Sequence, residues 1–259
     1  RDDMIIDMHS HILHGVDDGP KTTDESIGLL KQAVQEGITD IIATSHAYHP
    51  QFHTPFDKIS KQVKELAIEC NKRGIPINIY KGQEIRVCDQ TLNNLISGEA
   101  LSLANSKYVL IELPSQGIPT FTVQLIQQLL NQNKIPIIAH PERNRAIVEK
   151  PSRLAKLVQH GALAQVTAGS LSGHFGKTIQ RTALHLVDSH LVHVYGSDVH
   201  NMSNRPFLYN KGLNYLEKLK KHDYVDIMLE NNARILTNEE MILLEPNDIS
   251  KSKWWKVFS

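Results

Sequence analysis

The sequence has few cysteines, no long apolar run and no excess of charge of one sign, and each shortage excludes a class of protein. Its two cysteines, Cys70 and Cys88, are too few for a disulfide framework or a thiolate zinc site. No apolar stretch approaches the ~20 residues of a membrane-spanning helix, and no secretory signal opens the chain. Lysine plus arginine equals aspartate plus glutamate, 28 each, which does not indicate a general nucleic-acid-binding surface. We therefore expect a cytoplasmic protein that does not bind nucleic acid.

The composition of the 259 residues is that of an ordinary folded chain, with 41% hydrophobic and 22% charged residues. This length suits one large domain or two small ones, and α/β barrels commonly use it for one. No stretch is rich enough in proline, glycine or serine to divide the chain. We predict a single domain over residues 4–250 and a basic, aromatic tail over residues 251–259.

Short apolar runs alternate with amphipathic helical patterns along the chain. The runs are apolar on both sides of the pleat, as in strands that are buried in a parallel sheet. Asp24 could cap a helix over residues 25–36, and Pro55 could open another over residues 56–72. This alternation is typical of a parallel α/β fold. The seven predicted strands are residues 4–8, 40–44, 77–80, 108–111, 135–139, 163–166 and 192–195.

Seven parallel strands can lie in an open sheet or close into a barrel. An open sheet usually binds its ligand through a glycine-rich turn after the first strand, but here that strand ends in His9-Ser10-His11. Chemically capable side chains follow strand after strand, and a barrel collects such groups at the carboxyl ends of its strands. The pattern therefore favours an α/β barrel.

Histidines and carboxylates gather at the predicted strand ends. His9 and His11 are two residues apart, which points both rings to one face of a strand, and Asp198 and His200 repeat this spacing. Imidazole and carboxylate without thiolate suit manganese, iron or zinc. One catalytic ion uses about three protein ligands, so this number of candidates suggests two or three ions. The nine candidates are His9, His11, Asp18, His46, Glu84, Glu112, His140, Asp198 and His200.

A lone histidine at a strand end is more often a hydrogen-bonded structural residue than a ligand. Recurrence at equivalent positions favours the metal hypothesis, because converging carboxylates would repel one another without cations. Asp17 could bind in place of Asp18 or simply shape the loop. The remaining histidines are expected to be structural, except for four loop residues that are weak candidates for substrate contacts: His14, His49, His53 and His174.

The local strings carry a specific resemblance. The order of the nine candidates resembles the PHP (polymerase and histidinol phosphatase) family. The strings DMHSHILHGVDDGP, GQEIR, YVLIELP, IIAHPERN, TAGSLSGHFG and SDVHN resemble its manganese-dependent protein-tyrosine phosphatases of Gram-positive bacteria, the CpsB/CapC/YwqE type. The resemblance covers nearly the whole chain. It implies a distorted (β/α)7 barrel, TIM-barrel-like, whose metal site at the C-terminal ends of the strands holds two or three Mn²⁺ ions, with Fe or Zn as alternatives.

Carried over by position, the resemblance implies three ligand sets, two of which share Glu84. Many other PHP members have a histidine where this chain has Glu112, so the carboxylate matches the tyrosine-phosphatase branch. The three sets are His9, His11, Glu84 and Asp198; Glu84, Glu112 and His140; and Asp18, His46 and His200.

The resemblance also implies that Arg143 and Arg205 are catalytic residues that bind phosphate, since an arginine fork suits phosphate oxygens. Arg86 is a weaker candidate for the same role, and Glu142 is a candidate partner for an arginine. We expect direct attack on phosphorus by a metal-bridging hydroxide. His46 or His200 could act as general acid if metal binding leaves it free, although a tyrosinate of pKa ~10 leaves without much help.

Cysteine-dependent tyrosine phosphatases need the motif Cys-x5-Arg, and this motif is absent. The residue six positions after Cys70 is Pro76, and the residue six positions after Cys88 is Asn94. The hypothesis is therefore a metal-dependent enzyme that removes phosphate from phosphotyrosine on a membrane-associated tyrosine autokinase and so regulates capsule or exopolysaccharide biosynthesis.

Two alternatives stay open: a PHP phosphatase of a small metabolite such as histidinol phosphate, and a catalytically silent kinase-binding module. The strings IELP and HPERN favour the tyrosine phosphatase, and the presence of every predicted ligand disfavours the silent module. The tail, with its KWWKVF string, could seat at a membrane interface or in a partner groove, or pack on its own barrel. Contact with the membrane would place the protein at its inner face.

Overall fold

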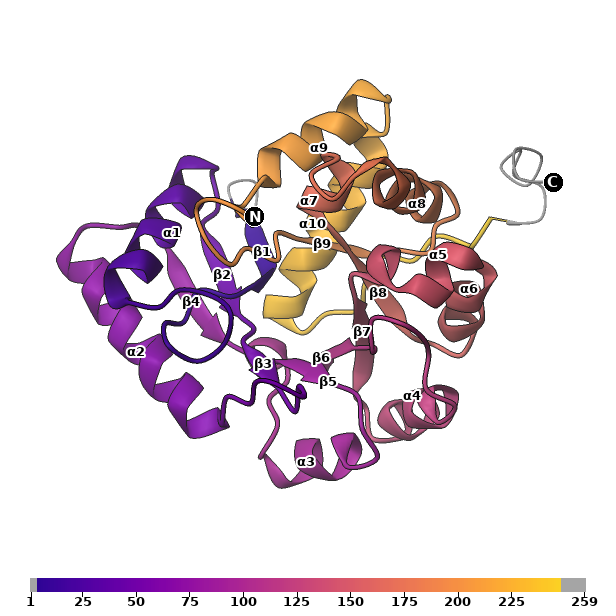
Figure 1. Cartoon of the computed structure of the whole chain (residues 1–259), viewed down its shortest axis with the longest axis horizontal. Helices are drawn as coiled ribbons and strands as arrows, with labels where there is room; N and C mark the ends of the chain where they lie inside the picture. Colours follow the sequence, from indigo (N-terminus) through magenta and orange to yellow (C-terminus); the bar gives the residue numbers. More distant parts are fainter. Residues whose placement is uncertain (1–3, 248–259) are drawn as a thin grey trace.

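The computed structural model describes residues 4–247, so the tail predicted at residues 251–259 lies outside the described residues (Figure 1). Parallel strands form two sheets in the described part of the chain. The first sheet contains β1 (Ile6–Ser10), β2 (Asp40–Ala43) and β4 (Asn78–Lys81), in this order. The second contains, in order, β3 (His46–Ala47), β5 (Glu84–Arg86), β6 (Tyr108–Glu112), β7 (Ile135–Ala139), β8 (Leu163–Thr167) and β9 (Val194–Gly196).

Seven of the strands overlap the seven predicted runs, and β3 and β5 continue the second and third runs beyond their predicted ends at residues 44 and 80. β2 and β3 form one run, interrupted at residues 44–45, and β4 and β5 form the next, interrupted at residues 82–83. β2 pairs with β4 and β3 pairs with β5, so both runs pass from the first sheet to the second side by side. Around the barrel the pairing follows chain order, and a bridge between Ser10 and Val199 joins the last run to the first. The predicted α/β class and the order of seven parallel runs are confirmed.

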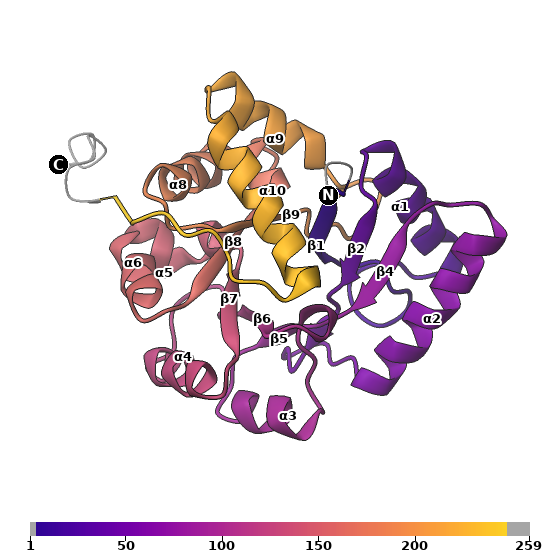
Figure 2. The ribbon, with the colours of Figure 1, turned by 180° about the vertical axis from the view of Figure 1, so that it is seen from behind.

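Helices surround the strands in both views (Figures 1 and 2). The first helix differs slightly from the prediction: it begins at Thr23, and the Thr22 side chain, not Asp24, accepts the capping hydrogen bond from the Glu25 backbone N–H. Asp24 instead lies in the first turn, where its negative charge interacts favourably with the positive end of the helix dipole. The α-helices are α1 (Thr23–Gln35), α2 (Phe56–Lys72), α3 (Thr91–Ser97), α4 (Thr122–Asn131), α5 (Arg145–Glu149), α6 (Ser152–Gln159), α7 (Ala168–Leu171), α8 (Lys177–Asp188), α9 (Tyr209–Lys218) and α10 (His222–Thr237), and the 3-10 helices are η1 (Leu103–Asn105) and η2 (Pro141–Arg143).

Side chains fill the inside of the barrel away from the candidate ligands. Met8, Ile42, Leu110, Ile137 and Val194 come from five strands and pack in one buried cluster with residues of α10 and the chain beyond it. A larger cluster packs the outer faces of the strands against the helices. The end of the barrel opposite the candidate ligands is therefore filled with packed side chains. In residues 4–247, no helix has the length and apolar character needed to cross a membrane.

The last helix ties the first strand to the last one. Asn232 in α10 donates from Nδ2 to the carbonyl oxygens of Ile6 (3.0 Å) and Tyr195 (2.8 Å), and its Oδ1 accepts from the Tyr195 N–H (3.1 Å). The Tyr209 hydroxyl donates to the Ile6 carbonyl as well (2.8 Å). Figure 2 shows α10 across the end of the barrel that lies at the back in Figure 1. Buried backbone groups at the seam between β1 and β9 thus have partners.

Candidate metal centre

The two histidines of the first run turn their Nε2 atoms toward the same two carboxylates. His9 Nε2 lies 3.1 Å and His11 Nε2 lies 3.0 Å from Glu84 Oε1. The same two nitrogens lie 3.2 and 3.3 Å from Asp198 Oδ1. All four side chains are buried, and Asp198 Oδ1 has no hydrogen-bond donor in the described part of the chain. A buried carboxylate oxygen without a donor, facing two ring nitrogens, has the environment of a metal ligand.

A second group forms around Asp18, at the mouth of the barrel. Its Oδ1 lies 3.2 Å from His200 Nε2 and 3.4 Å from His46 Nε2. The other ring nitrogen of His200 donates to the Asp198 carbonyl (2.8 Å), which leaves Nε2 unprotonated and directed at Asp18. That Nε2 is buried and lacks a hydrogen-bond partner among the described residues. The geometry therefore aims a free lone pair of His200 at the same point as the Asp18 carboxylate.

The third group contains Glu112 and His140, from the ends of β6 and β7. His140 Nε2 lies 3.0 Å from Glu84 Oε2 and 3.6 Å from Glu112 Oε2. Arg86 Nε donates to Glu112 Oε1 at 2.9 Å, so this arginine is held against a candidate ligand. Glu84 contacts histidines of the first and third groups through different oxygens, which makes it the central carboxylate of the site.

Two candidate ligands have a strained backbone. His140 has φ 33° and Asp198 has φ 53°, both in the left-handed region that costs a residue with a Cβ atom of order 1 kcal/mol or more. Each is held there by a backbone hydrogen bond: the His140 N–H donates to Gln165 Oε1 (3.2 Å), and the Asp198 N–H donates to the His9 carbonyl (2.8 Å). The surrounding structure thus forces these two side chains to turn into the barrel mouth.

Two further side chains orient the histidine rings. Gln165 Oε1 lies 2.8 Å from His9 Nδ1, and Asp17 Oδ2 lies 2.9 Å from His11 Nδ1. With a proton on each Nδ1, each Nε2 presents its lone pair to the centre. Asp17 also accepts from the backbone of His46 and therefore shapes the loop, one of the two roles that the sequence left open. Sequence reasoning missed Gln165, although a buried polar residue within an apolar strand is a signal that could have identified it.

Asp7 and Ser197 hold the backbone that leads into Asp198. Asp7 accepts from the Ser197 backbone N–H (2.9 Å) and from its hydroxyl (2.5 Å), and so fixes the residue before Asp198. Burial raises the pKa of Asp7 to about 6, and the hydrogen bonds from Ser197 limit that rise.

Charge in the centre is balanced between carboxylates and imidazoles. Burial opposes protonation of His140, yet hydrogen bonds to Glu112 and Glu84 raise its pKa to about 9. Burial alone would raise the pKa of Glu84, but the positive charges of His9 and His46 hold it well below its usual range. Without another cation the carboxylates thus require protons on the histidines. A divalent cation can replace those protons, because it binds the neutral imidazole.

The donor set suits hard or borderline divalent metals, since it combines imidazole nitrogens with carboxylate oxygens and contains no thiolate. The ligand atoms within each of three overlapping groups all lie within 4.8 Å of one another. All nine candidates converge at the mouth of the barrel, while their individual roles as ligands stay a prediction. By this distance the groups among the described residues are His9, His11, Glu84 and Asp198; His11, Asp18, His46 and His200; and His46, Glu84 and Glu112. His140 belongs to none of them, unlike in the predicted set, although its Nε2 lies 3.0 Å from Glu84 Oε2.

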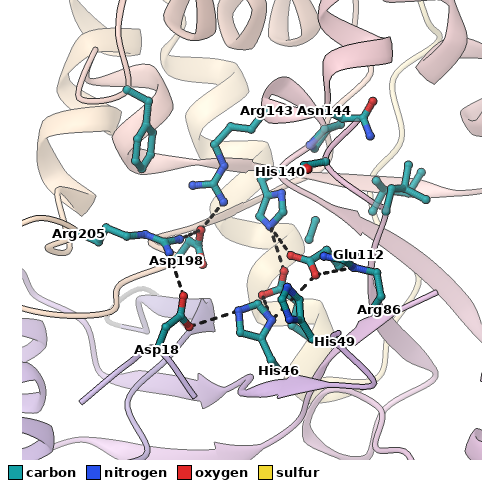
Figure 3. Close-up of a pocket in the computed structure, with 17 residues that line it drawn as sticks. Asp18, His46, His49, Arg86, Glu112, His140, Arg143, Asn144, Asp198 and Arg205 are labelled. Atoms are coloured by element: carbon teal, nitrogen blue, oxygen red, sulfur yellow. Dashed lines mark hydrogen bonds and ion pairs between the residues drawn. The ribbon is translucent and has the colours of Figure 1, made fainter. Parts of the chain in front are cut away.

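Arg143 and Arg205 lie beside this cluster on one wall of a cavity of about 470 Å³ (Figure 3). Both guanidinium groups donate from Nη2 to Asp198 Oδ2, at 2.5 and 2.8 Å. Arg205 also approaches Asp18 Oδ2 at 3.6 Å. Arg86 lines the same cavity on the other side of the site. The arrangement places positive charge above a floor of carboxylates and imidazoles, which suits a phosphate group.

The weaker candidates from the sequence differ in whether they reach the cavity. Of the four loop histidines, only His49 lines the cavity. His174 Nε2 instead lies 2.5 Å from the Asn204 carbonyl oxygen. Glu142 is buried, interacts electrostatically with Arg143 as predicted for an arginine partner, and accepts from the Thr167 N–H (3.3 Å) and the Ser170 hydroxyl (2.7 Å) at α7.

Comparison with known proteins relates this site to one family. The family described as "Capsular polysaccharide synthesis, CpsB/CapC" matches residues 5–237. The chain is 41% identical over 251 residues to CapC of Staphylococcus aureus, with 97% of this chain and 98% of that protein covered. It is 37% identical over 254 residues to tyrosine-protein phosphatase YwqE of Bacillus subtilis (strain 168), with 98% and 100% covered. Tyrosine-protein phosphatase CpsB of Streptococcus pneumoniae is 30% identical over 246 residues, with 92% and 100% covered.

Solved structures agree with this relationship. One solved structure superposes on this chain with a TM-score of 0.91 at 37% identity. It is described among structures of YwqE from Bacillus subtilis and CpsB from Streptococcus pneumoniae, as unique metal-dependent tyrosine phosphatases. The superposition covers 94% of this chain and 100% of the other. A β-aspartyl dipeptidase from Fervidobacterium islandicum, 14% identical with a TM-score of 0.53 over 89% of this chain and 72% of that one, shares the fold alone. By sequence and by structure, this chain belongs to the CpsB/CapC family of capsular polysaccharide synthesis.

Proposed function

We propose that this protein is a metal-dependent protein-tyrosine phosphatase. The observation that carries the proposal is a cluster of five histidines and four carboxylates beside two arginines, at the floor of a cavity open to solvent. Relatives at 30–37% identity bear the name tyrosine-protein phosphatase, which supports the same activity. Neither Cys70 nor Cys88 lines the cavity, so the chain offers no thiol nucleophile there.

The metal proposed is Mn²⁺, in two or three sites, with iron or zinc as alternatives. Bound ions would acidify a water molecule for attack on phosphorus and would offset the charge of the phosphate oxygens. Glu84, Glu112 and Asp198 are buried and Asp18 is exposed beside them, so the four carboxylates repel one another unless positive charge lies between them, and bound cations would supply that charge. The residues proposed to hold the ions are His9, His11, Asp18, His46, Glu84, Glu112, His140, Asp198 and His200.

Arg143 and Arg205 are proposed to bind the phosphate and to hold the charge that develops during transfer. Their shared contact with Asp198 Oδ2 keeps both guanidinium groups at the edge of the cluster, with donors left for phosphate oxygens. The leaving tyrosinate has a pKa near ~10, so it needs little help from a general acid. His46, which lines the cavity, is the proposed proton donor to the departing oxygen, whereas His200 directs the lone pair of Nε2 at the Asp18 carboxylate.

Hydrolysis of a phosphotyrosine peptide tests the function. A phosphoserine peptide and histidinol phosphate serve as competing substrates, each with EDTA and then with added Mn²⁺. His140→Ala should abolish turnover, and His222→Ala, at the exposed start of α10, should not change it. Better turnover of histidinol phosphate would identify a metabolite phosphatase. Bound metal without turnover of any ester would identify a silent binding module.

The proposed substrate is a tyrosine autokinase at the inner face of the membrane, in capsule or exopolysaccharide synthesis. The family description, which names capsular polysaccharide synthesis, supports this partner class. Removal of residues 251–259 should spare hydrolysis of a free phosphopeptide and weaken association with the kinase or with liposomes. Unchanged association would remove the tail from this proposal.

A further inference from the structure

One wall of the cavity carries an aromatic ring to which the phosphatase chemistry assigns no role. Phe175, in the loop between α7 and α8, lines the cavity together with Arg143 and Arg205. Its ring is half-buried, so part of its surface stays accessible. The guanidinium carbon of Arg143 lies 4.9 Å from the ring centroid. The ring is therefore adjacent to the group proposed to hold the phosphate.

The surrounding backbone fixes the position of this ring. A Cβ atom at Gly169 in α7 would lie 2.8 Å from Phe175 Cε2, so the ring packs against the bare backbone of that glycine. The preceding residue, His174, fixes the loop because its Nε2 lies 2.5 Å from the carbonyl oxygen of Asn204, which directly precedes Arg205. Contacts on two sides thus place Phe175 beside the arginines.

A phosphate ester held at this place must direct its organic group away from the carboxylates and toward the open mouth. Phe175 and Pro141 line the cavity together with Arg143, and their side chains are apolar and carry no hydrogen-bond donor. An aryl ester places a flat, rigid ring directly beyond the ester oxygen, whereas an alkyl ester has no ring to pack. Aromatic rings gain from offset or edge-to-face contact with one another.

We propose that Phe175 is a specificity-determining residue that packs against the aromatic ring of the substrate and so selects aryl over alkyl phosphate monoesters. The inference rests on the proposed phosphatase function and names the substrate class of that site. Aromatic pairs of this kind are worth about 2- to 10-fold in binding. The competing explanation is that Phe175 only supports Arg143, in which case its loss would weaken aryl and alkyl ligands equally.

Binding of two non-hydrolysable anions separates the explanations. The dissociation constants of phenylphosphonate and ethylphosphonate are measured by calorimetry on the Mn²⁺-loaded full chain. The variants are Phe175→Ala, Phe175→Leu, which keeps apolar volume without a ring, and Phe175→Tyr, which keeps the ring. Phe56→Ala is the matched control, since Phe56 is 43% exposed at the start of α2 and does not line the cavity.

We expect Phe175→Ala and Phe175→Leu to reduce the preference for phenylphosphonate by about 2- to 10-fold, the value of one aromatic pair. Phe175→Tyr and Phe56→Ala should keep the preference. An equal loss for both anions, an unchanged ratio, or wild-type protein that does not prefer phenylphosphonate would overturn the proposal.

Turnover of the phosphotyrosine peptide is measured on the same samples to separate this inference from the proposed function. A wild-type protein that hydrolyses no ester, but loses its phenylphosphonate preference in Phe175→Ala, would refute the phosphatase and retain the aryl-selective site. A wild-type protein that hydrolyses phosphotyrosine with a ratio unaffected by Phe175 would retain the phosphatase and refute the selective ring.

Discussion

Gln165 accepts a hydrogen bond from His9 through Oε1, which lies 2.8 Å from His9 Nδ1, and it belongs to none of the metal-ligand groups. The same oxygen accepts the backbone N–H of His140, in the strained segment after β7. One amide therefore sets the protonated nitrogen of one proposed ligand and the backbone position of another. Such supporting residues tune metal affinity without contact with the ion.

Replacement of Gln165 by leucine should weaken metal binding about 10- to 100-fold, the usual loss when an orienting partner of a ligand histidine is removed. Gln165→Glu keeps an acceptor oxygen at the same place and should lose less. Calorimetric titration with Mn²⁺ measures both variants against the wild type. Equal affinity of Gln165→Leu and wild type would show that Gln165 does not orient the ligands.

Metal should stabilise the folded protein as well as activate it. Three of the carboxylates at the mouth are buried and Asp18 is exposed beside them, and cations remove their mutual repulsion. At a free Mn²⁺ concentration 100 times the dissociation constant, binding stabilises the fold by about 2.7 kcal/mol per site. Thermal unfolding with EDTA and with Mn²⁺ should therefore differ by several degrees. Glu84→Gln, which alters the central carboxylate, should reduce that difference, and an undiminished shift would place the metal elsewhere.

Acid should destabilise the protein partly through a histidine outside the metal centre. His193 is buried and accepts the Ala164 N–H at Nδ1, and burial lowers its pKa from 6.5 to about 4. The unfolded chain binds this proton more readily, so stability is complete above pH 6.5 and falls as pH decreases toward 4. The loss between pH 7 and pH 5 should be roughly 2 kcal/mol.

The variant His193→Asn tests that loss, because its Oδ1 can accept the Ala164 N–H but does not titrate. Urea unfolding at pH 7 and pH 5 gives the free energy of unfolding of both proteins. The wild type should lose roughly 2 kcal/mol more than the variant. Parallel losses in the two proteins would assign the acid sensitivity to other groups.

Close packing between α7 and α9 should make Gly212 intolerant of any side chain. An added Cβ atom would lie 2.8 Å from the Ala168 carbonyl oxygen, and backbone atoms cannot rotate away. Alanine favours a helix over glycine by about 1 kcal/mol, but overpacking of this kind typically costs about 1–3 kcal/mol. Gly212→Ala should therefore lower the free energy of unfolding. Gly117→Ala, where an added Cβ meets nothing within 4 Å, should be nearly neutral in the same denaturant titration.

The sequence was sufficient to predict which candidate ligands lie close together, because parallel strands place their carboxyl ends on one rim of the barrel. His9 and Asp198 are far apart in the chain, yet both end apolar runs, and the structure brings His9 Nε2 within 3.2 Å of Asp198 Oδ1. The strands β3 and β5 were not predicted, because the residues after β2 and β4 are mostly polar and carry no apolar strand pattern. These two strands start the second sheet at His46 and Glu84, which pair side by side in it.

Residues that act through an uncharged contact, by hydrogen bonding or packing, were harder to predict than residues that act through charge. Gln165 and Phe175 have side chains that occur in any folded protein, and their roles depend on what lies next to them. Phe175 matters for the site because the guanidinium carbon of Arg143 lies 4.9 Å from the centroid of its ring. Gly169 matters because the same ring leaves no room for a Cβ atom at that position. Pairwise relations of this kind follow only from the three-dimensional arrangement.

The hydrogen bonds of Asn232 to Ile6 and Tyr195 also determine when the chain can finish folding during its synthesis. The seam between the first and last strands needs a residue near the end of α10, so a ribosome must release almost the whole domain before the ring can close. Until then β1 has β2 as a neighbour, while the side that contacts β9 and α10 in the finished fold stays uncovered.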